Sequence, residues 1–199
     1  MGNIINLNKK WRFRKENGDW ENVDIPHTWN GQDGQDGTGM WRGKCCYEKE
    51  ITFSEEELKK NLYLEIGAAS LVSSVYINGQ LAYTNTCPYS MYRVLMNEYI
   101  RFGKNIIYIE VDNSHKEAVY PQMADFSFYG GLYRSVNIIE AEDIHFDYLD
   151  GSRDGVYVSA KQIEKDTWTL NIKGNVINKG AECKATISYK LVDVNNVVC

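Results

Sequence analysis

The feature that most constrains the fold is a succession of short strand-like runs, each ended by turn residues. Residues 47–53 alternate, with Tyr47 and Phe53 at the two ends of one apolar face, and such alternation predicts a strand with one buried side. Residues 105–111 are β-branched and nearly all apolar, which predicts a central strand. Similar runs occur at residues 62–66, 72–78, 81–84 and 133–139.

Turn and helix signals agree with this strand pattern. Asn78-Gly79 lies between two of the runs, and this dipeptide is the strongest short hairpin signal. Residues 54–57 read Ser-Glu-Glu-Glu, a capping box that predicts one or two helical turns between strands. Only three prolines interrupt the chain. The sequence therefore predicts an all-β fold, with a jelly-roll sandwich over residues 1–140.

The remaining segment, residues 141–199, has a different pattern. Residues 168–176 and 185–191 alternate on either side of a polar link, Asn178-Lys179-Gly180, and an apolar run begins again at residue 197. These are the expected opening strands of an immunoglobulin-like sandwich. Some 55 residues make only about half of such a domain. We therefore expect a truncated domain that is less stable than the first, unless a neighbouring chain completes it.

Composition excludes several classes of partner. The formal charge is −5, which argues against nucleic acid and anionic membranes, because both attract basic surfaces. No apolar run reaches the 18 residues of a membrane span, and the N-terminus lacks the apolar core of a signal peptide. The composition is that of an ordinary globular protein.

The cysteines indicate free thiols. Their odd number, the adjacent pair and the absence of C-x-x-C spacing argue against a disulfide framework and against a zinc site. A reducing, cytoplasmic setting is the simplest account. If the adjacent pair lies on a strand, its side chains point to opposite faces, so we expect at most one to be buried with its sheet. The five are Cys45, Cys46, Cys87, Cys183 and Cys199.

Two segments near the N-terminus could serve a site. His27, in Ile25-Pro26-His27-Thr28-Trp29, could be a base, but no nucleophile motif surrounds it, and a packed histidine beside a tryptophan is the favoured interpretation. Residues 31–43 are rich in glycine and end in Trp41-Arg42-Gly43. They match neither a phosphate loop nor an EF-hand. A binding rim and an ordinary solvated connection both remain open.

One carboxylate stands out among aromatic residues. Asp125 lies between Tyr120 and Tyr133, close to Phe126 and Phe128, and a Gly130-Gly131 turn follows. Proteins hold sugars with a carboxylate that accepts hydroxyl hydrogen bonds and rings that cover the C–H face. A hairpin with a solvated aspartate is the alternative. No second carboxylate marks the pair that glycoside hydrolysis uses.

Taken in order, these motifs resemble a known family. The succession is similar to the N-terminal sugar-binding domain of glycoside hydrolase family 2, which contains β-galactosidases, β-glucuronidases and β-mannosidases. It covers nearly all of residues 1–140, and the tail resembles the start of the family's immunoglobulin-like domain. The motifs are Ile25-Pro26-His27-Thr28-Trp29, Asp33-Gly34-Gln35-Asp36-Gly37, Trp41-Arg42-Gly43, Val75-Tyr76-Ile77-Asn78-Gly79, Asp112-Asn113, Asp125-Phe126 and Gly130-Gly131-Leu132-Tyr133-Arg134-Ser135-Val136.

The resemblance implies roles for individual residues. Asp125 matches the aspartate that reaches the galactosyl hydroxyls in the family's β-galactosidases. Arg42 corresponds to an asparagine in the best-known member and departs from it, although arginine also donates to hydroxyls. Its neighbour Trp41 is a further substrate-binding candidate, whereas Arg134 is expected to anchor structure. The two catalytic glutamates lie in a TIM barrel that follows the first two domains, so no catalytic residue is expected in this chain.

Three functions follow as expectations. The first is the non-catalytic N-terminal part of a retaining β-galactosidase-type enzyme, inactive alone, whose partners are a β-galactoside or related carbohydrate and the catalytic domain. A carboxylate at Asp125 would repel a uronic acid and so favours galactosides over glucuronides. The second is a free-standing carbohydrate-binding module. The third is an assembly domain, since an apolar sheet face left open in the tail would favour a homo-oligomer. No cofactor or metal is implied.

Overall fold

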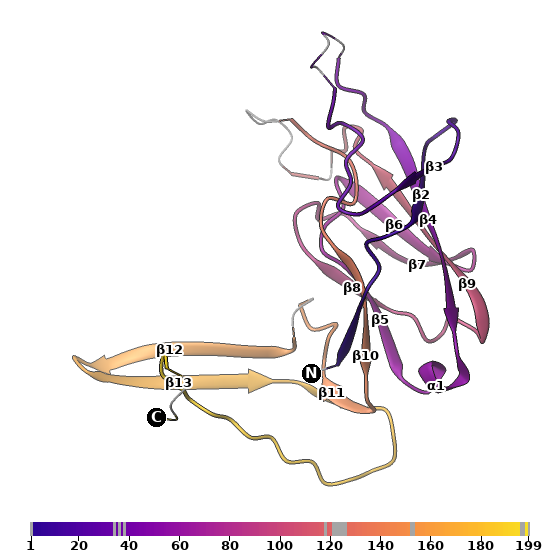
Figure 1. Cartoon of the computed structure of the whole chain (residues 1–199). Coiled ribbons are helices and arrows are strands. Elements are labelled where there is room, and N and C mark those ends of the chain that lie inside the picture. The colour runs from indigo at the N-terminus through magenta and orange to yellow at the C-terminus, as the bar shows by residue number, and fades with distance from the viewer. Residues whose placement is uncertain are drawn as a thin grey trace.

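The computed structural model describes residues 2–33, 35, 37, 39–117, 119–120, 127–151, 154–195 and 198. It contains a β-sandwich from which a long β-hairpin extends (Figure 1). A six-stranded sheet has the order β3-β2-β4-β9-β6-β7, and a four-stranded sheet has the order β1-β10-β5-β8. All of their strand pairs are antiparallel. The predicted all-β sandwich is therefore confirmed.

The strands of the sandwich have the following bounds. They are β1 (Asn3–Asn6), β2 (Trp11–Lys15), β3 (Glu21–Val23), β4 (Lys44–Phe53), β5 (Asn61–Ile66), β6 (Val72–Ile77), β7 (Gln80–Asn85), β8 (Tyr92–Leu95), β9 (Gly103–Asp112) and β10 (Val136–Ala141).

The core lies between the two sheets and follows the alternation of the sequence. In β9 every second residue is buried, and β9 pairs with β4 over ten residues in the middle of its sheet. The predicted central strand is thus confirmed. Trp11 and Phe13 from β2, and Tyr47 and Phe53 from β4, expose at most 1% of their surface. These large side chains make the burial of apolar area the main stabilising contribution.

The predicted turn and helix are both present. Asn78 and Gly79 have φ angles of 51° and 81°, as a two-residue hairpin of the primed type requires, and they join β6 to β7. Helix α1 (Glu55–Leu58) begins after Ser54, which forms the capping box with Glu57. Within the described residues, no helix has the length and apolar character needed to cross a bilayer.

Some strands differ from the prediction. Strands β1, β2, β3 and β8 had no clear signal, because each is short and mixes polar with apolar residues. Strand β10 begins at Val136 and not at residue 133. Before it, the Tyr133 hydroxyl donates to the carbonyl of Pro88 at 2.5 Å and the Arg134 guanidinium donates to the carbonyl of Tyr89 at 3.1 Å. Residues 133 and 134 thus tie loops together at the end of the sandwich.

The expectation for the adjacent cysteines was wrong, because both are buried. Cys45 belongs to the core between the sheets, whereas Cys46 lies on the opposite face of β4 with 4% exposure. Tyr108 covers Cys46 there and donates its hydroxyl hydrogen to the thiol sulfur at 2.6 Å. A side chain on the outer face of a sheet is therefore buried by a neighbouring ring. Among the described cysteines, Cys45, Cys46, Cys87 and Cys183 are free thiols.

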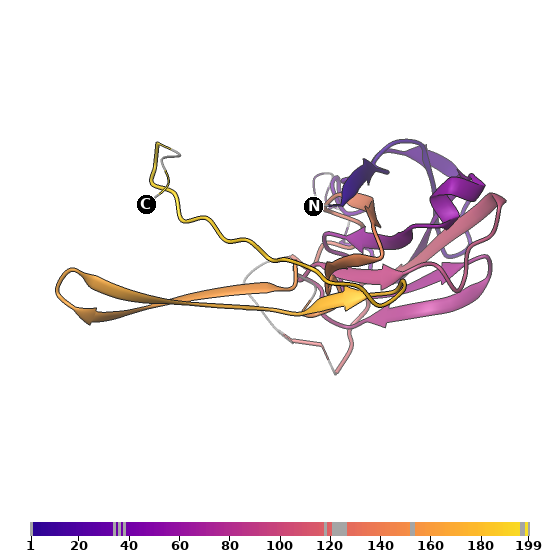
Figure 2. The same ribbon diagram turned by 90° about the horizontal axis from the view of Figure 1, so that it is seen from below.

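The segment after β10 forms two small sheets outside the sandwich. Strand β11 (Ile144–Phe146) pairs with β14 (Val176–Asn178), and β12 (Val156–Glu164) pairs with β13 (Thr167–Gly174). The β12–β13 hairpin extends away from the sandwich (Figure 2), and Trp168 on it is 57% exposed. Residues 181–191 form no strand, because no neighbouring strand pairs with them. The domain boundary at residues 140 and 141 stays a prediction.

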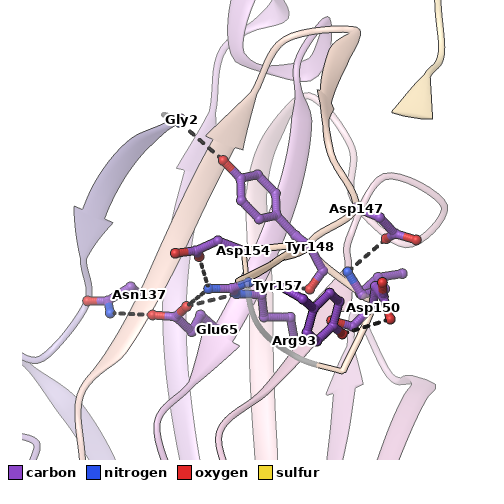
Figure 3. A network of polar contacts seen from close by, with 10 residues as sticks. Gly2, Glu65, Arg93, Asn137, Asp147, Tyr148, Asp150, Asp154 and Tyr157 are labelled. Atoms are coloured by element: carbon purple, nitrogen blue, oxygen red, sulfur yellow. Dashed lines mark hydrogen bonds and ion pairs between the residues drawn. The ribbon is translucent and has the colours of Figure 1, made fainter. Parts of the chain in front are cut away.

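A buried arginine fastens the start of this segment to the four-stranded sheet (Figure 3). The guanidinium of Arg93 on β8 contacts the Glu65 carboxylate of β5 at 2.7 Å and that of Asp154 at 3.2 Å. It also lies 5.1 Å from the centre of the Tyr148 ring. The Arg93 side chain is only 4% exposed. Tyr148 packs in turn against Tyr63, with ring centres 5.4 Å apart.

Candidate functional site

Two long connections meet at one end of the sandwich. Residues 24–43 link β3 to β4, and residues 113–135 link β9 to β10. The backbone N–H of His27 donates to the Leu132 carbonyl at 2.8 Å, and the Thr28 hydroxyl donates to the Gly130 carbonyl at 2.7 Å. We call residues 27–33, 41–43, 113 and 127–132 the loop cluster. It contains the described parts of the motifs that suggested a sugar site.

Asn30 is the first of two buried amides that hold the loop cluster together. Its side-chain N–H groups donate to the Asp33 carboxylate and to the Trp41 carbonyl, both at 2.7 Å. Its side-chain oxygen accepts the backbone N–H of Gly130 at 2.7 Å. Asn30 is fully buried. One side chain therefore joins residues 30–33 to Trp41 and to the distant Gly130.

Asn113 is the second buried amide. Its side-chain nitrogen donates to the Asn30 side-chain oxygen and to the Phe128 carbonyl, both at 3.1 Å. Its side-chain oxygen accepts the Gly43 N–H at 2.8 Å. Because buried polar groups are costly unless paired, the two amides together specify one arrangement of the loops.

Gly130 and Gly131 allow a close approach of two segments. A Cβ atom at Gly130 would lie 1.9 Å from the indole of Trp29, and one at Gly131 would lie 2.2 Å from the His27 carbonyl oxygen. Gly131 also has a φ of +135°, which favours glycine. Glycine is therefore favoured at both positions because this turn packs directly on residues 27–29.

Trp41 belongs to the loop cluster but is held by structural contacts. Its ring lies edge to face with that of Trp29 at 6.2 Å and packs against Gly43. The Lys15 ammonium lies 5.1 Å from the Trp41 ring centre. The Trp41 backbone N–H donates to the Asp33 carboxylate at 2.9 Å. Trp41 is half-buried, so part of it can still face a ligand.

Arg42 is the exposed cation of the loop cluster. Its Nε donates to the Asn113 carbonyl at 2.9 Å, and its guanidinium lies 4.9 Å from the centre of the Phe128 ring. These contacts fix the stem and the plane of the side chain. The remaining N–H groups can donate to hydroxyl or carboxylate oxygens of a ligand.

Asp125, the leading sequence candidate, lies outside the described residues. The structure places the other two candidates, Trp41 and Arg42, together in the loop cluster. The substrate-binding roles of Asp125, Trp41 and Arg42 stay predictions. No role for Asn30 or Asn113 was predicted from the sequence. Each is an uncharged amide placed directly after a strand or an aromatic motif, and that position alone does not mark a buried residue.

The described loop cluster carries no catalytic pair. Its one carboxylate, Asp33, accepts hydrogen bonds from Asn30 and from the Trp41 backbone. His27 is half-buried, and burial lowers its pKa from the usual 6.5. No group of three or more His, Cys, Asp or Glu is arranged to hold a metal in the part of the chain that the structure describes. The arrangement can bind and orient polar groups.

A cavity of about 640 Å³ lies away from the loop cluster. It is lined by residues of β10 and of the segment that follows, such as Ile139 and Tyr148, together with Ile4, Glu65 and Arg93. Neither Trp41 nor Arg42 contributes to it. Its size alone does not identify this cavity as the functional site, because the residues of the sequence motifs meet in the loop cluster.

Known proteins are similar to this chain over most of its length. No family model matches. A β-glucuronidase from Bacteroides fragilis is 29% identical over 98% of the chain, and a β-galactosidase from Thermoanaerobacter pseudethanolicus is 24% identical over 92%. The crystal structure of an FMN-binding β-glucuronidase from Faecalibacterium prausnitzii superimposes with a TM-score of 0.81 and 36% identity over 89% of the chain.

The chain spans only part of these proteins. It corresponds to 29%, 26% and 28% of their respective lengths. The likeness in sequence and in structure covers the sandwich and most of the segment that follows, and it agrees with the order of motifs noted in the sequence. The chain therefore belongs to glycoside hydrolase family 2 and corresponds to the N-terminal region of the family's enzymes.

Proposed function

We propose that this chain is the non-catalytic N-terminal part of an enzyme that hydrolyses β-glycosides, and that its loop cluster forms one wall of the sugar pocket. The observation that carries this proposal is the pairing of Asn30 with Asn113. It brings Trp41, Arg42 and residues 127–131 together at one end of the sandwich. A fixed wall of donors and rings can orient a sugar for a reaction.

Within this proposal Asp125 accepts hydrogen bonds from sugar hydroxyls. It precedes Gly130 by five residues in the sequence, and the amide network holds Gly130. Arg42 donates to the same sugar or to its neighbour. Contacts of this kind accelerate hydrolysis when they are stronger in the transition state than in the bound substrate.

The catalytic carboxyl groups come from another part of the enzyme. Hydrolysis with retention needs two carboxyl groups about 5–5.5 Å apart, and the described loop cluster offers only Asp33, which is engaged in structural hydrogen bonds. The family resemblance implies a TIM barrel with two glutamates. We therefore expect the 199-residue chain alone to be inactive.

Two substrate classes fit the proposal. A carboxylate at Asp125 favours β-galactosides, because it would repel a uronic acid. The exposed guanidinium of Arg42 offers a partner for a uronate carboxylate, and the relative with 29% sequence identity is a β-glucuronidase. Both substrates are β-glycosides, and the distinction is a matter for experiment.

The test compares hydrolysis by two proteins. The 199-residue chain, and the complete enzyme in which this region is joined to a catalytic domain, are assayed with p-nitrophenyl β-D-galactoside and p-nitrophenyl β-D-glucuronide. The proposal predicts turnover of at least one substrate by the complete enzyme and none by the chain alone. Turnover by the chain alone would contradict it.

A carbohydrate-binding module is the second candidate. It is favoured by Tyr129 of the loop cluster, which is 47% exposed, since exposed rings serve as sugar platforms. Calorimetric titration of the chain with galactose and with glucuronate distinguishes the two. Saturable binding to the isolated chain would favour the module, and its absence would favour a pocket shared with a catalytic domain.

A further inference from the structure

His27 connects the loop cluster to the core of the sandwich. Its Nδ1 lies 2.7 Å from the hydroxyl of Tyr47, and its ring packs on that of Phe13 with centres 4.7 Å apart. Tyr47 and Phe13 are both core residues of the six-stranded sheet. On its other side, the His27 backbone meets Gly131 and Leu132.

The direction of the His27–Tyr47 hydrogen bond follows from the surroundings of the phenol. Burial raises the pKa of Tyr47 well above its usual value, so this phenol keeps its proton. The phenol hydrogen needs an acceptor of its own. Nδ1 of a neutral His27 provides it.

Few charged groups face His27. Strand β4 presents the Tyr47 phenol, and β3 presents the carboxylate of Glu21, which favours protonation of His27. Strand β2 presents Phe13, which lies opposite Glu21 in the sheet. Residues 131 and 132 contact His27 through the backbone. Among the described residues, burial is therefore the main influence on the protonation of this imidazole and Glu21 opposes it, while the Tyr47 hydroxyl engages Nδ1.

We propose that neutral His27 is a positioning residue for the loop cluster. By accepting the Tyr47 hydrogen it holds residues 27–30 on the core, and through Asn30 it sets the place of Trp41 and Gly130. The positioning role of His27 is independent of the proposed function. Only its consequence rests on that function: the wall of the sugar pocket would be ordered at neutral pH and altered in acid.

Protonation reverses the arrangement at Nδ1. A proton on Nδ1 would face the phenol hydrogen, so that two donors meet and one must turn away. Since His27 is harder to protonate in the folded chain than in the unfolded chain, the interaction is fully present above about pH 6.5 and is lost as the pH falls below it. Residues 27–30 should then shift relative to the core.

The test is a titration of the chain by nuclear magnetic resonance between about pH 7.5 and 5, a range that brackets ordinary histidine titration. The ring signals of His27 and the backbone amides of Asn30, Trp41 and Gly130 are followed together. We expect one common midpoint. Amides that do not titrate, or that titrate with a different midpoint, would overturn the proposal.

Two variants separate positioning from simple packing. His27→Asn keeps an acceptor near the Nδ1 position but cannot be protonated, so the loop amides should resemble wild type at neutral pH and lose their pH dependence. Tyr47→Phe removes the donor, so the loop amides should already be shifted at neutral pH. A pH response that persists in His27→Asn, or unshifted amides in Tyr47→Phe, would contradict the role.

The chain supplies a matched control pair. The Tyr63 hydroxyl lies 2.7 Å from Nε2 of His145 on the far side of the four-stranded sheet. His145→Asn and Tyr63→Phe make the same chemical changes there and should leave the titration of the loop amides unchanged. Neither experiment measures sugar binding, so failure here would leave the proposed function standing.

Discussion

The side-chain amide of Asn113 donates to the side-chain oxygen of Asn30 at 3.1 Å, and both residues are completely buried. The two lie 83 positions apart in the sequence, one after the Ile-Pro-His-Thr-Trp motif and one at the end of β9. Neither amide titrates, so pH can act on this pair only through a neighbouring group such as His27. The candidate sugar wall depends on this contact.

Replacement of Asn30 by alanine should destabilise the chain. The Gly130 N–H and the Asn113 amide would lose their acceptor inside the protein, and each unmet buried group costs about 1–3 kcal/mol. We expect a loss of at least about 2 kcal/mol in the free energy of unfolding, measured by urea denaturation. The control is Asn3→Ala, which removes an exposed amide contact to Glu140 and should leave the midpoint nearly unchanged. Equal midpoints for the two variants would contradict the role of Asn30.

Replacement of Gly130 by alanine should displace Trp29. The new methyl group would overlap the indole ring, and overpacking of this kind costs about 1–3 kcal/mol. We expect a lower midpoint of thermal unfolding and a changed tryptophan emission spectrum. Gly39→Ala is the control, because nothing lies within 4 Å of a Cβ at that position. If both variants behave alike, the close packing of Gly130 on Trp29 is not needed.

The fold was largely predictable because its central strands are regular. Strands β4, β5, β6 and β9 alternate or are wholly apolar, and the Asn78-Gly79 turn and the Ser54 cap have local causes. Strands β1, β3 and β8 contain three or four residues each and are held by neighbours distant in sequence, so no local pattern marks them. The same limit applies to the tail, where residues 185–191 alternate but find no strand to pair with.

The candidate site was predictable only as a set of motifs. Trp41 and Arg42 were identified by family order, and the structure shows how each is held. The buried amides Asn30 and Asn113 were missed, because an asparagine in a loop is ordinarily exposed. Nothing in the neighbouring sequence shows that its side chain hydrogen-bonds several distant segments. The burial of Cys46 was missed for a related reason, since the residue that covers it, Tyr108, lies on another strand.

Removal of Glu65 should loosen the segment after β11. Its carboxylate is the nearest partner of Arg93, whose side chain is 4% exposed, and loss of one member of a buried ion pair costs about 3–5 kcal/mol. In Glu65→Ala we expect lower stability and faster hydrogen exchange at Tyr148 and Leu149. Glu56→Ala breaks an exposed pair with Lys59 and should change neither. Unaltered exchange at Tyr148 in Glu65→Ala would show that Arg93 does not hold this segment.

The thiols should differ in reactivity according to burial. Cys87 and Cys183 are exposed, whereas Cys45 and Cys46 are buried, and burial raises the pKa of the Cys45 thiol. Because the thiolate is the reactive form, iodoacetamide should label Cys87 and Cys183 first, as measured by peptide mass spectrometry. Labelling in urea serves as the reference for complete access. Early labelling of Cys45 in the native chain would contradict its place in the core.

The most direct test of the central claim is the effect of Asp125→Ala on kcat/KM of the complete enzyme with its β-glycoside substrate. Loss of hydrogen bonds from sugar hydroxyls to a charged group, each contributing about 1.5–3 kcal/mol, should lower kcat/KM about 10-fold to 100-fold. Asp166→Ala, at the exposed tip of the β12–β13 hairpin, should leave kcat/KM at the wild-type value. If Asp125→Ala also retains the wild-type kcat/KM, this region does not form the sugar pocket.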